Sequence, residues 1–194
     1  MKKDIILSGV GGQGILSIAT VIGRAALEEG LQIKQAEVHG MSQRGGDVQS
    51  NLRISSSRID SDLIARGGAD LIISLEPMEA LRYLPWLAAD GWVITNTVPF
   101  VNIPNYPDAG TLQRELASLP HVVALDVDSL AKAAASPRSA NMVLLGAAAP
   151  FLGLEAGKFE QGIRAIFARK GDAVVEMNLA AFRAGYEQAK KQIR

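Results

Sequence analysis

Apolar and polar residues in the first part of the chain follow the periods of a strand, a helix and a second strand. Residues 4–7 form a short apolar run, residues 15–29 repeat apolar positions at helical spacing, and residues 31–38 alternate like a strand. This order predicts a βαβ unit. Residues 48–54 also alternate apolar and polar side chains, which predicts a half-buried strand that runs antiparallel to its predecessor.

The middle of the chain carries three continuous apolar runs, at residues 69–76, 91–97 and 121–126. Such short runs are typical of strands that are buried on both faces of a parallel sheet. Between these strands the pattern predicts helices at residues 77–84, where a proline takes the first helical position, and at residues 111–118.

The last third of the chain is helical in its pattern. One of its segments, residues 139–149, is almost uniformly apolar and small, so it is either buried on all sides or packed against a partner. We see no internal repeat and no linker. The sequence therefore predicts an α/β fold: a single three-layer, Rossmann-like domain over residues 1–194, with a mostly parallel sheet, helices on both faces and a helical C-terminal part. The helices of that part are expected at residues 128–135, 139–149, 159–169 and 172–193.

Charge and composition narrow the function classes. Lysine plus arginine and aspartate plus glutamate both number 20, so the formal charge is zero and we expect no nucleic-acid partner. The chain has no cysteine, which excludes disulfides, thiolate zinc sites and cysteine-ligated iron-sulfur clusters. Residues 1–7 look like the start of a strand rather than a signal peptide, and no stretch reaches the roughly 20 apolar residues of a membrane span. We expect a soluble, cytoplasmic protein without a membrane partner.

A glycine-rich loop lies between the first strand and the first helix. Gly9, Gly11 and Gly14 satisfy GxGxxG in the strand-to-helix context which that motif requires, and Gly12 and Gln13 lie between them. Backbone N–H groups at such a turn point outward, and the helix dipole lies behind them. The loop therefore predicts an anion-binding site, usually for phosphate. The alternative is a tight turn that binds nothing.

The same loop allows a dinucleotide interpretation. Glu37 ends the second predicted strand, near the place where a ribose-binding acid belongs in NAD-binding folds. Against NAD, no second substrate-binding half follows in the sequence.

A polar segment follows at residues 39–46, too polar and glycine-rich to be core. His39 is either a general base or the residue that turns the chain. Arg44 is placed so that its guanidinium can reach a phosphate or a carboxylate, with a salt bridge across the loop as the alternative. Met41 is more typical of core packing.

Polar residues also end the later strands. Glu76, Asn96 and Thr97 lie at the carboxyl ends of predicted parallel strands, where open α/β sheets bind ligands. Asn141 either caps the helix that begins there or reaches an interface, and we favour the cap; we interpret His121 as solvated surface.

The motifs SGVGGQGIL at residues 8–16 and EVHGMSQRGG at residues 37–46, supported by SLEPMEALRYL at 74–84 and TNT at 95–97, resemble the gamma-type domain of 2-oxoacid:ferredoxin oxidoreductases. The residues of the second motif are most similar to the corresponding segment in the small (beta) subunits of the indolepyruvate, or aryl pyruvate, branch of that family. The resemblance covers essentially the whole chain.

The resemblance implies a subunit that completes an active site and is inactive alone. The large alpha subunit would hold thiamine diphosphate and the [4Fe-4S] clusters, ferredoxin would accept the electrons, and the small chain would contact coenzyme A. It assigns no catalytic residue and no metal ligand to this chain. Matched to the family's segments are Gly9, Gly11, Gly12, Gln13 and Gly14, and then Glu37, His39, Met41, Ser42, Gln43, Arg44, Gly45 and Gly46. Two alternatives stay open from the residues themselves: a stand-alone NAD(P)-binding oxidoreductase, and a nucleotide-binding interaction module.

Overall fold

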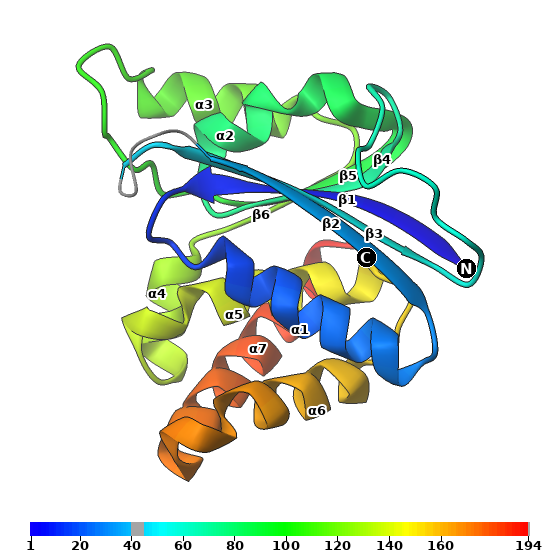
Figure 1. Cartoon of the computed structure of the whole chain (residues 1–194). Coiled ribbons are helices and arrows are strands. Elements are labelled where there is room, and N and C mark those ends of the chain that lie inside the picture. The colour runs from blue at the N-terminus through cyan, green and yellow to red at the C-terminus, as the bar shows by residue number, and fades with distance from the viewer. Residues whose placement is uncertain (40–44, 194) are drawn as a thin grey trace.

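The computed structural model describes residues 1–39 and 45–193, and in this part of the chain a six-stranded sheet forms the middle layer (Figure 1). The strand order is β2-β3-β1-β4-β5-β6. The strands are β1 (Lys2–Val10), β2 (Gln32–His39), β3 (Asp47–Ser55), β4 (Ala69–Ser74), β5 (Leu87–Asn96) and β6 (Val122–Leu125).

One strand runs against the others. β3 pairs antiparallel with both β1 and β2, whereas β1, β4, β5 and β6 pair in parallel. The predicted mostly parallel sheet and the predicted antiparallel direction of β3 are both confirmed. The sequence did not predict that β3 inserts between β1 and β2, the two outer strands of the βαβ unit.

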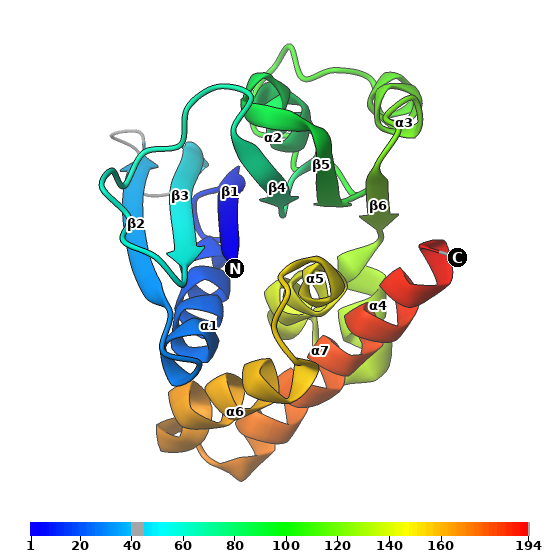
Figure 2. The ribbon, with the colours of Figure 1, turned by 90° about the vertical axis from the view of Figure 1, so that its right-hand side faces the viewer.

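Helices cover both faces of the sheet, as predicted (Figures 1 and 2). One face carries α2 (Pro77–Arg82) and α3 (Ala109–Ala117). The other face carries the remaining α-helices, of which α6 and the first part of α7 lie beyond α1 and α5 (Figure 2). These are α1 (Ile15–Glu28), α4 (Val127–Ala134), α5 (Ala140–Ala148), α6 (Ala156–Phe167) and α7 (Asp172–Gln192). Within the described residues no helix has the length and apolar character needed to cross a bilayer.

Alternate residues of the central strands fill two hydrophobic cores. Ile6, Ile72 and Val93 pack toward α2 and α3. Their neighbours, such as Ile5 and Leu71, pack into the larger core on the side of α1 and α5. Burial of both faces explains why these strands are continuous apolar runs.

Helix α5 is core. Its residues from Met142 to Ala148 are all buried, which decides between the two alternatives for residues 139–149. It crosses α7 at a pair of glycines: a Cβ atom on Gly146 would overlap the carbonyl oxygen of Phe182, and one on Gly185 would overlap that of Val143. The two helix backbones can approach this closely only because neither glycine has a side chain.

The last turn of α7 returns to the sheet at β6, which is an edge strand. The side chain of Gln192 accepts a hydrogen bond from the Ala124 N–H at 3.3 Å and donates one to the Ala124 carbonyl oxygen at 3.1 Å. The amide of one side chain thus bonds both backbone groups of this edge residue.

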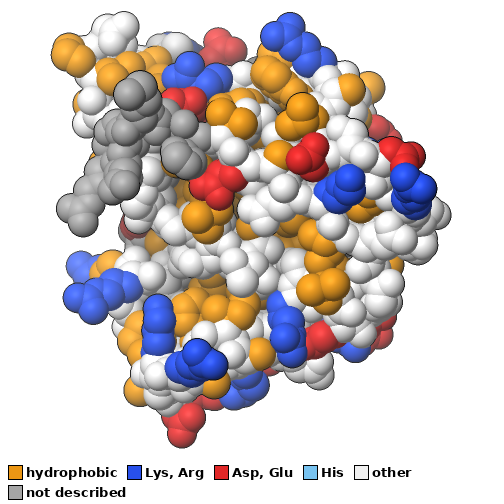
Figure 3. Space-filling model, in the orientation of Figure 1, with side chains coloured by type: hydrophobic (Ala, Val, Ile, Leu, Met, Phe, Trp, Pro, Cys, Tyr) orange, Lys and Arg blue, Asp and Glu red, His pale blue; other side chains and the backbone are white. Residues whose placement is uncertain are grey.

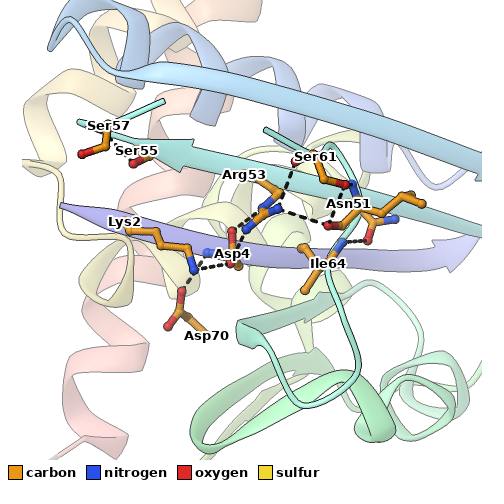
Figure 4. A network of polar contacts seen from close by, with 10 residues as sticks. Lys2, Asp4, Asn51, Arg53, Ser55, Ser57, Ser61, Ile64 and Asp70 are labelled. Atoms are coloured by element: carbon orange, nitrogen blue, oxygen red, sulfur yellow. Dashed lines mark hydrogen bonds and ion pairs between the residues drawn. The ribbon is translucent and has the colours of Figure 1, made fainter. Parts of the chain in front are cut away.

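A polar network closes the amino-terminal edge of the sheet (Figure 4). The buried Asp4 carboxylate accepts from Arg53 Nε at 2.7 Å and Nη2 at 3.0 Å, and Lys2 Nζ lies 2.9 Å away. Burial by itself raises the pKa of Asp4, but hydrogen bonds and charge from Arg53 and Lys2 outweigh it, so the pKa lies below its ordinary value.

Candidate functional site

The glycine loop lies between β1 and α1 at the carboxyl edge of the sheet. Gly12 and Gly14 hold positive φ angles of 101° and 87°, a conformation that glycine adopts without strain. A Cβ atom on Gly12 would meet no atom within 4 Å, whereas one on Gly14 would lie 2.7 Å from Asn141 Nδ2. Gly11 is not among the described glycines with positive φ. The loop is therefore open at Gly12 and packed at Gly14.

Gln13 braces this loop against the neighbouring strand. Its Oε1 accepts a hydrogen bond from the Val10 N–H at 2.8 Å, and its Nε2 donates to the Leu75 carbonyl oxygen at 3.3 Å. Because both ends of the amide are used inside the protein, the first role of Gln13 is to fix the shape of the loop.

Helix α1 begins directly behind Gly14. Among the described residues no side chain caps it, and its first turn holds no acid. The N–H groups of a first helical turn have no partner within the helix, and the dipole is positive there. This end of α1 has the properties that the sequence predicted for an anion-binding site.

A cavity of about 220 Å³ opens beside the loop. Its walls come from the glycine loop, the ends of β4 and β5, and the starts of α4 and α5. The lining residues are Gly12, Gln13, Leu75, Asn96, Val127, Asp128, Pro137, Arg138, Ala140 and Asn141.

Asn96 connects three walls of this cavity. Its Nδ2 donates to the Leu75 carbonyl oxygen at 3.4 Å and to Asp128 Oδ2 at 3.1 Å. Its Oδ1 accepts from the Val98 and Val127 N–H groups at 3.2 Å and 3.3 Å. The predicted position at a strand end is confirmed, and the side chain holds β4, β5 and α4 together around the cavity.

Arg138 and Asn141 belong to the same cavity, although the sequence did not indicate them as site residues. Arg138 is exposed and forms no ion pair within the part of the chain that the structure describes. Asn141 was predicted to cap a helix, which is wrong: its Nδ2 donates to the Gly14 carbonyl oxygen at 3.2 Å and so joins α5 to the glycine loop.

The second motif meets the first at the end of β1. The Gly11 N–H donates to the Gly46 carbonyl oxygen at 2.8 Å, and the Gly45 N–H lies 3.5 Å from the Gly11 carbonyl oxygen. The antiparallel pairing of β1 with β3 produces this contact, because it sets Val10 opposite Asp47. The predicted site residues Met41, Ser42, Gln43 and Arg44 lie outside the described residues.

Glu37 and His39 lie on β2. Glu37 is exposed, and His39 is the last residue of the strand, paired with Val48 of β3. Since β3 separates β2 from β1, Glu37 is two strand spacings, about 9–10 Å, from the strand that carries the glycine loop. The dinucleotide interpretation needs that acid on the strand beside β1, so this topology disfavours NAD.

Glu76 is fully buried and has structural partners for both carboxylate oxygens. Oε2 caps α2 by accepting from the Glu79 N–H at 2.8 Å. Oε1 accepts from the Phe100 N–H at 3.3 Å and from the Tyr106 hydroxyl. Burial and this hydrogen bond raise the pKa of Tyr106 above its ordinary value. Glu76 therefore anchors α2 and the loop after β5, away from the cavity lining.

The structure also places Thr97 and His121, for which we made predictions from the sequence. Thr97 is half-buried, and its N–H donates to the Leu125 carbonyl oxygen at 2.9 Å, which extends the pairing of β5 with β6. His121 was interpreted as solvated surface; instead its ring stacks on Trp92 at a centroid distance of 5.0 Å and its Nδ1 is buried. In the described residues no group of three or more histidine, aspartate or glutamate side chains is arranged to hold a metal ion.

Residues 4–188 match the family "Pyruvate ferredoxin/flavodoxin oxidoreductase". The chain belongs to this family. The resemblance found in the sequence is thereby confirmed.

The relatives that are 34–37% identical to this chain share one name, and a relative at 28% has another. "Indolepyruvate oxidoreductase subunit IorB" of Archaeoglobus fulgidus is 37% identical over 97% of this chain and 96% of that protein. The protein of the same name from Pyrococcus horikoshii is 36% identical over 100% of this chain and 99% of its own length. "Ketoisovalerate oxidoreductase subunit VorA" of Methanothermobacter thermautotrophicus is 28% identical over 96% of this chain, but only 36% of that longer protein is covered.

Solved structures share the fold. The gamma subunit of a keto/oxoacid ferredoxin oxidoreductase from Geobacter sulfurreducens superposes with a TM-score of 0.72 over 97% of this chain and 99% of that one, at 24% identity. The 2-oxoglutarate:ferredoxin oxidoreductase of Magnetococcus marinus, solved with 2-oxoglutarate, coenzyme A and succinyl-CoA, gives 0.76 over 98% of this chain and 31% of that one, at 22% identity. The predicted α/β fold with helical C-terminal part is confirmed.

Proposed function

We propose that this chain is the small subunit of an indolepyruvate ferredoxin oxidoreductase and acts only together with a large subunit. The observation that carries the proposal is the 34–37% identity to four IorB subunits over 97–100% of this chain. The complex would convert an aryl pyruvate and coenzyme A to the acyl-CoA and CO₂, and the two electrons released would reduce ferredoxin.

The large subunit would carry the cofactors of this reaction. Thiamine diphosphate supplies the chemistry that decarboxylates a 2-oxo acid, and iron-sulfur clusters conduct the electrons. Without cysteine, this chain offers no thiolate to hold such clusters. Its role in the complex is therefore to form one wall of a shared site and to contribute charged and polar groups to that wall.

The cavity beside Gly12 fits part of coenzyme A and not all of it. A volume of about 220 Å³ lies below the roughly 300–1,000 Å³ of sites that enclose a whole drug-sized ligand. The one acid among the described lining residues, Asp128, accepts a hydrogen bond from Asn96 Nδ2 at 3.1 Å, and the start of α1 and the guanidinium of Arg138 favour an anion. These residues would hold one phosphate group, and the large subunit would enclose the remainder of the ligand.

Reconstitution tests the proposal. The chain is mixed with the large subunit of the same organism, and ferredoxin reduction is measured with indolepyruvate and coenzyme A, each omitted in turn. We expect a stable complex whose activity needs both chains and both substrates. Pyruvate, 2-oxoglutarate and a branched-chain 2-oxo acid serve as comparison substrates and identify the preferred 2-oxo acid. Absence of a complex and of any gain in activity would refute the proposal.

A further inference from the structure

The loop at residues 97–108, between β5 and α3, carries several exposed apolar side chains. Four of its side chains are exposed: Val98 by 40%, Phe100 by 45%, Val101 by 72% and Ile103 by 38%. Residues 97–107 include no charged side chain. Apolar side chains gather at the upper left of Figure 3, where Figure 1 draws this loop. A cluster of this kind on one short loop is typical of a protein-binding surface, whereas scattered exposed apolar residues are common.

Hydrogen bonds to Glu76 and Gly45 hold this loop in place. The Phe100 N–H and the Tyr106 hydroxyl both donate to the buried carboxylate of Glu76. Asn102 Nδ2 donates to the Gly45 carbonyl oxygen at 2.7 Å. An apolar loop that is already ordered loses little conformational entropy when a partner covers it, so the arrangement favours binding.

The loop adjoins the candidate site. Gly45, which accepts the bond from Asn102, also contacts Gly11 of the glycine loop. The apolar side chains and the cavity beside Gly12 thus lie on the same carboxyl edge of the sheet. A partner seated on the loop would be brought to the open side of the candidate site.

The lengths of relatives indicate what the occupant is. In VorA, the part similar to this chain is 36% of the protein, so that part is joined covalently to the other 64% (100 − 36) of the polypeptide. The IorB relatives are matched over 96–99% of their own length, and a chain of that length needs a binding surface in place of the covalent connection. Such interfaces have an apolar core with few charges and with aromatic residues such as Phe100.

We propose that the loop at residues 98–103 is the surface on which the large subunit docks, through an uncharged apolar groove of that subunit. This inference rests on the proposed function, because it takes the large subunit as the partner. It adds which surface of the small chain makes the contact.

A charge placed on the loop tests the proposal. In Val101→Asp the carboxylate would have to be buried in the interface, and we expect the dissociation constant for the large subunit, measured by calorimetry, to rise at least tenfold. Phe100→Ala removes the aromatic ring without adding charge and is expected to act in the same direction. Leu63→Asp is the matched control, because Leu63 is 57% exposed on an irregular loop at the opposite edge of the sheet; its affinity should equal that of the unchanged protein. Thermal unfolding of all variants checks the fold.

The outcomes separate the two proposals. If the unchanged chain binds and Val101→Asp binds within twofold of it, the docking surface is wrong while the proposed function stands. If the unchanged chain fails to bind the large subunit at all, the proposed function falls and the docking surface falls with it. If Val101→Asp instead dissolves a dimer of this chain, the occupant is a second copy, and the large-subunit assignment is overturned.

Discussion

Substitution of Arg138 tests most directly whether a positive charge in the candidate site binds an anionic group of the ligand. Arg138 lines the cavity next to the open side of Gly12. In the reconstituted complex we expect Arg138→Ala to raise the KM for coenzyme A about tenfold, the loss of one charge-assisted hydrogen bond of about 1.4 kcal/mol, with little change in kcat. Arg58→Ala, at a guanidinium that is 86% exposed at the other edge of the sheet, is the control. Equal KM values in both variants would remove Arg138 from the site.

Asp4 gives a residue-level prediction about acid stability. Its pKa is lowered in the folded protein by Arg53 and Lys2, against the effect of burial. The pKa of Asp4 is lower in the folded protein than in the unfolded chain, where it is about 3.9, so the ionised carboxylate stabilises the fold at pH values above about 3.9. This contribution is lost as the pH falls through the pKa of the folded state. We expect Asp4→Asn to cost about 1.5–3 kcal/mol at pH 7 and progressively less below pH 4.

Urea unfolding at a series of pH values measures this difference. Asp62→Asn, at an exposed position, should leave the whole profile unchanged. The pKa of Glu79 is shifted in the opposite direction, because burial raises it despite the pairing with Arg82. Glu79 contributes equally to the pH dependence of both proteins, so the difference in unfolding free energy between Asp4→Asn and the unchanged protein isolates Asp4. A constant difference from pH 7 to pH 2 would contradict the assignment.

At this scale the sequence located positions better than roles. Glu76, Asn96 and Thr97 do lie at strand ends, because apolar runs with a polar last residue fix where a buried strand stops. The direction of each side chain depends on what packs beyond the strand, and so Glu76 caps α2 while Asn96 lines the cavity. Asn141 and Gly14 are 127 residues apart, and no periodicity relates residues at that separation.

At the scale of elements, the crossing of α5 and α7 depends on two missing side chains. Gly146→Ala would push a methyl group into the backbone of α7 at Phe182. We expect a loss of about 3 kcal/mol from overpacking, or roughly 6–12 °C in Tm for a chain of this length. Calorimetric or circular-dichroism melting measures it.

Gly157 provides the control within a helix. It lies in α6, where an added Cβ atom would meet nothing within 4 Å. Gly157→Ala should keep or raise the stability by up to about 1 kcal/mol, the helix-propensity difference between the residues. If Gly146→Ala melts like Gly157→Ala, the close approach of the two helices is wrong.

Some element bounds followed the sequence closely, whereas the strands predicted at 4–7 and 91–97 are observed as Lys2–Val10 and Leu87–Asn96. The helix predicted at 172–193 is observed as Asp172–Gln192, and the strand predicted at 48–54 as Asp47–Ser55. The order of strands did not follow in the same way. The periodicity of apolar residues predicts which faces of a strand are buried. It does not predict which strands are adjacent, because strand pairing joins segments that are far apart in the sequence.

At the scale of the whole molecule, the insertion of β3 changes how the glycine loop can be used. It places Glu37 away from the strand that carries the loop. We therefore expect titration calorimetry of the chain with NAD and with NADP to show no binding tighter than a dissociation constant of about 1 mM. A Kd in the micromolar range for either nucleotide would restore the NAD interpretation; coenzyme A, titrated in parallel with the assembled complex, is the positive comparison.

The contact of Gln192 with Ala124 has a consequence for handling the protein. An edge strand with free backbone groups is a template on which another chain can add a strand, the first step toward aggregation. On β6 one side-chain amide occupies the backbone donor and acceptor of Ala124, in the middle of the strand. A purification tag joined rigidly to the last turn of α7 would pull this amide away and uncover the edge, so a tag at the amino end is the safer choice for concentrated samples.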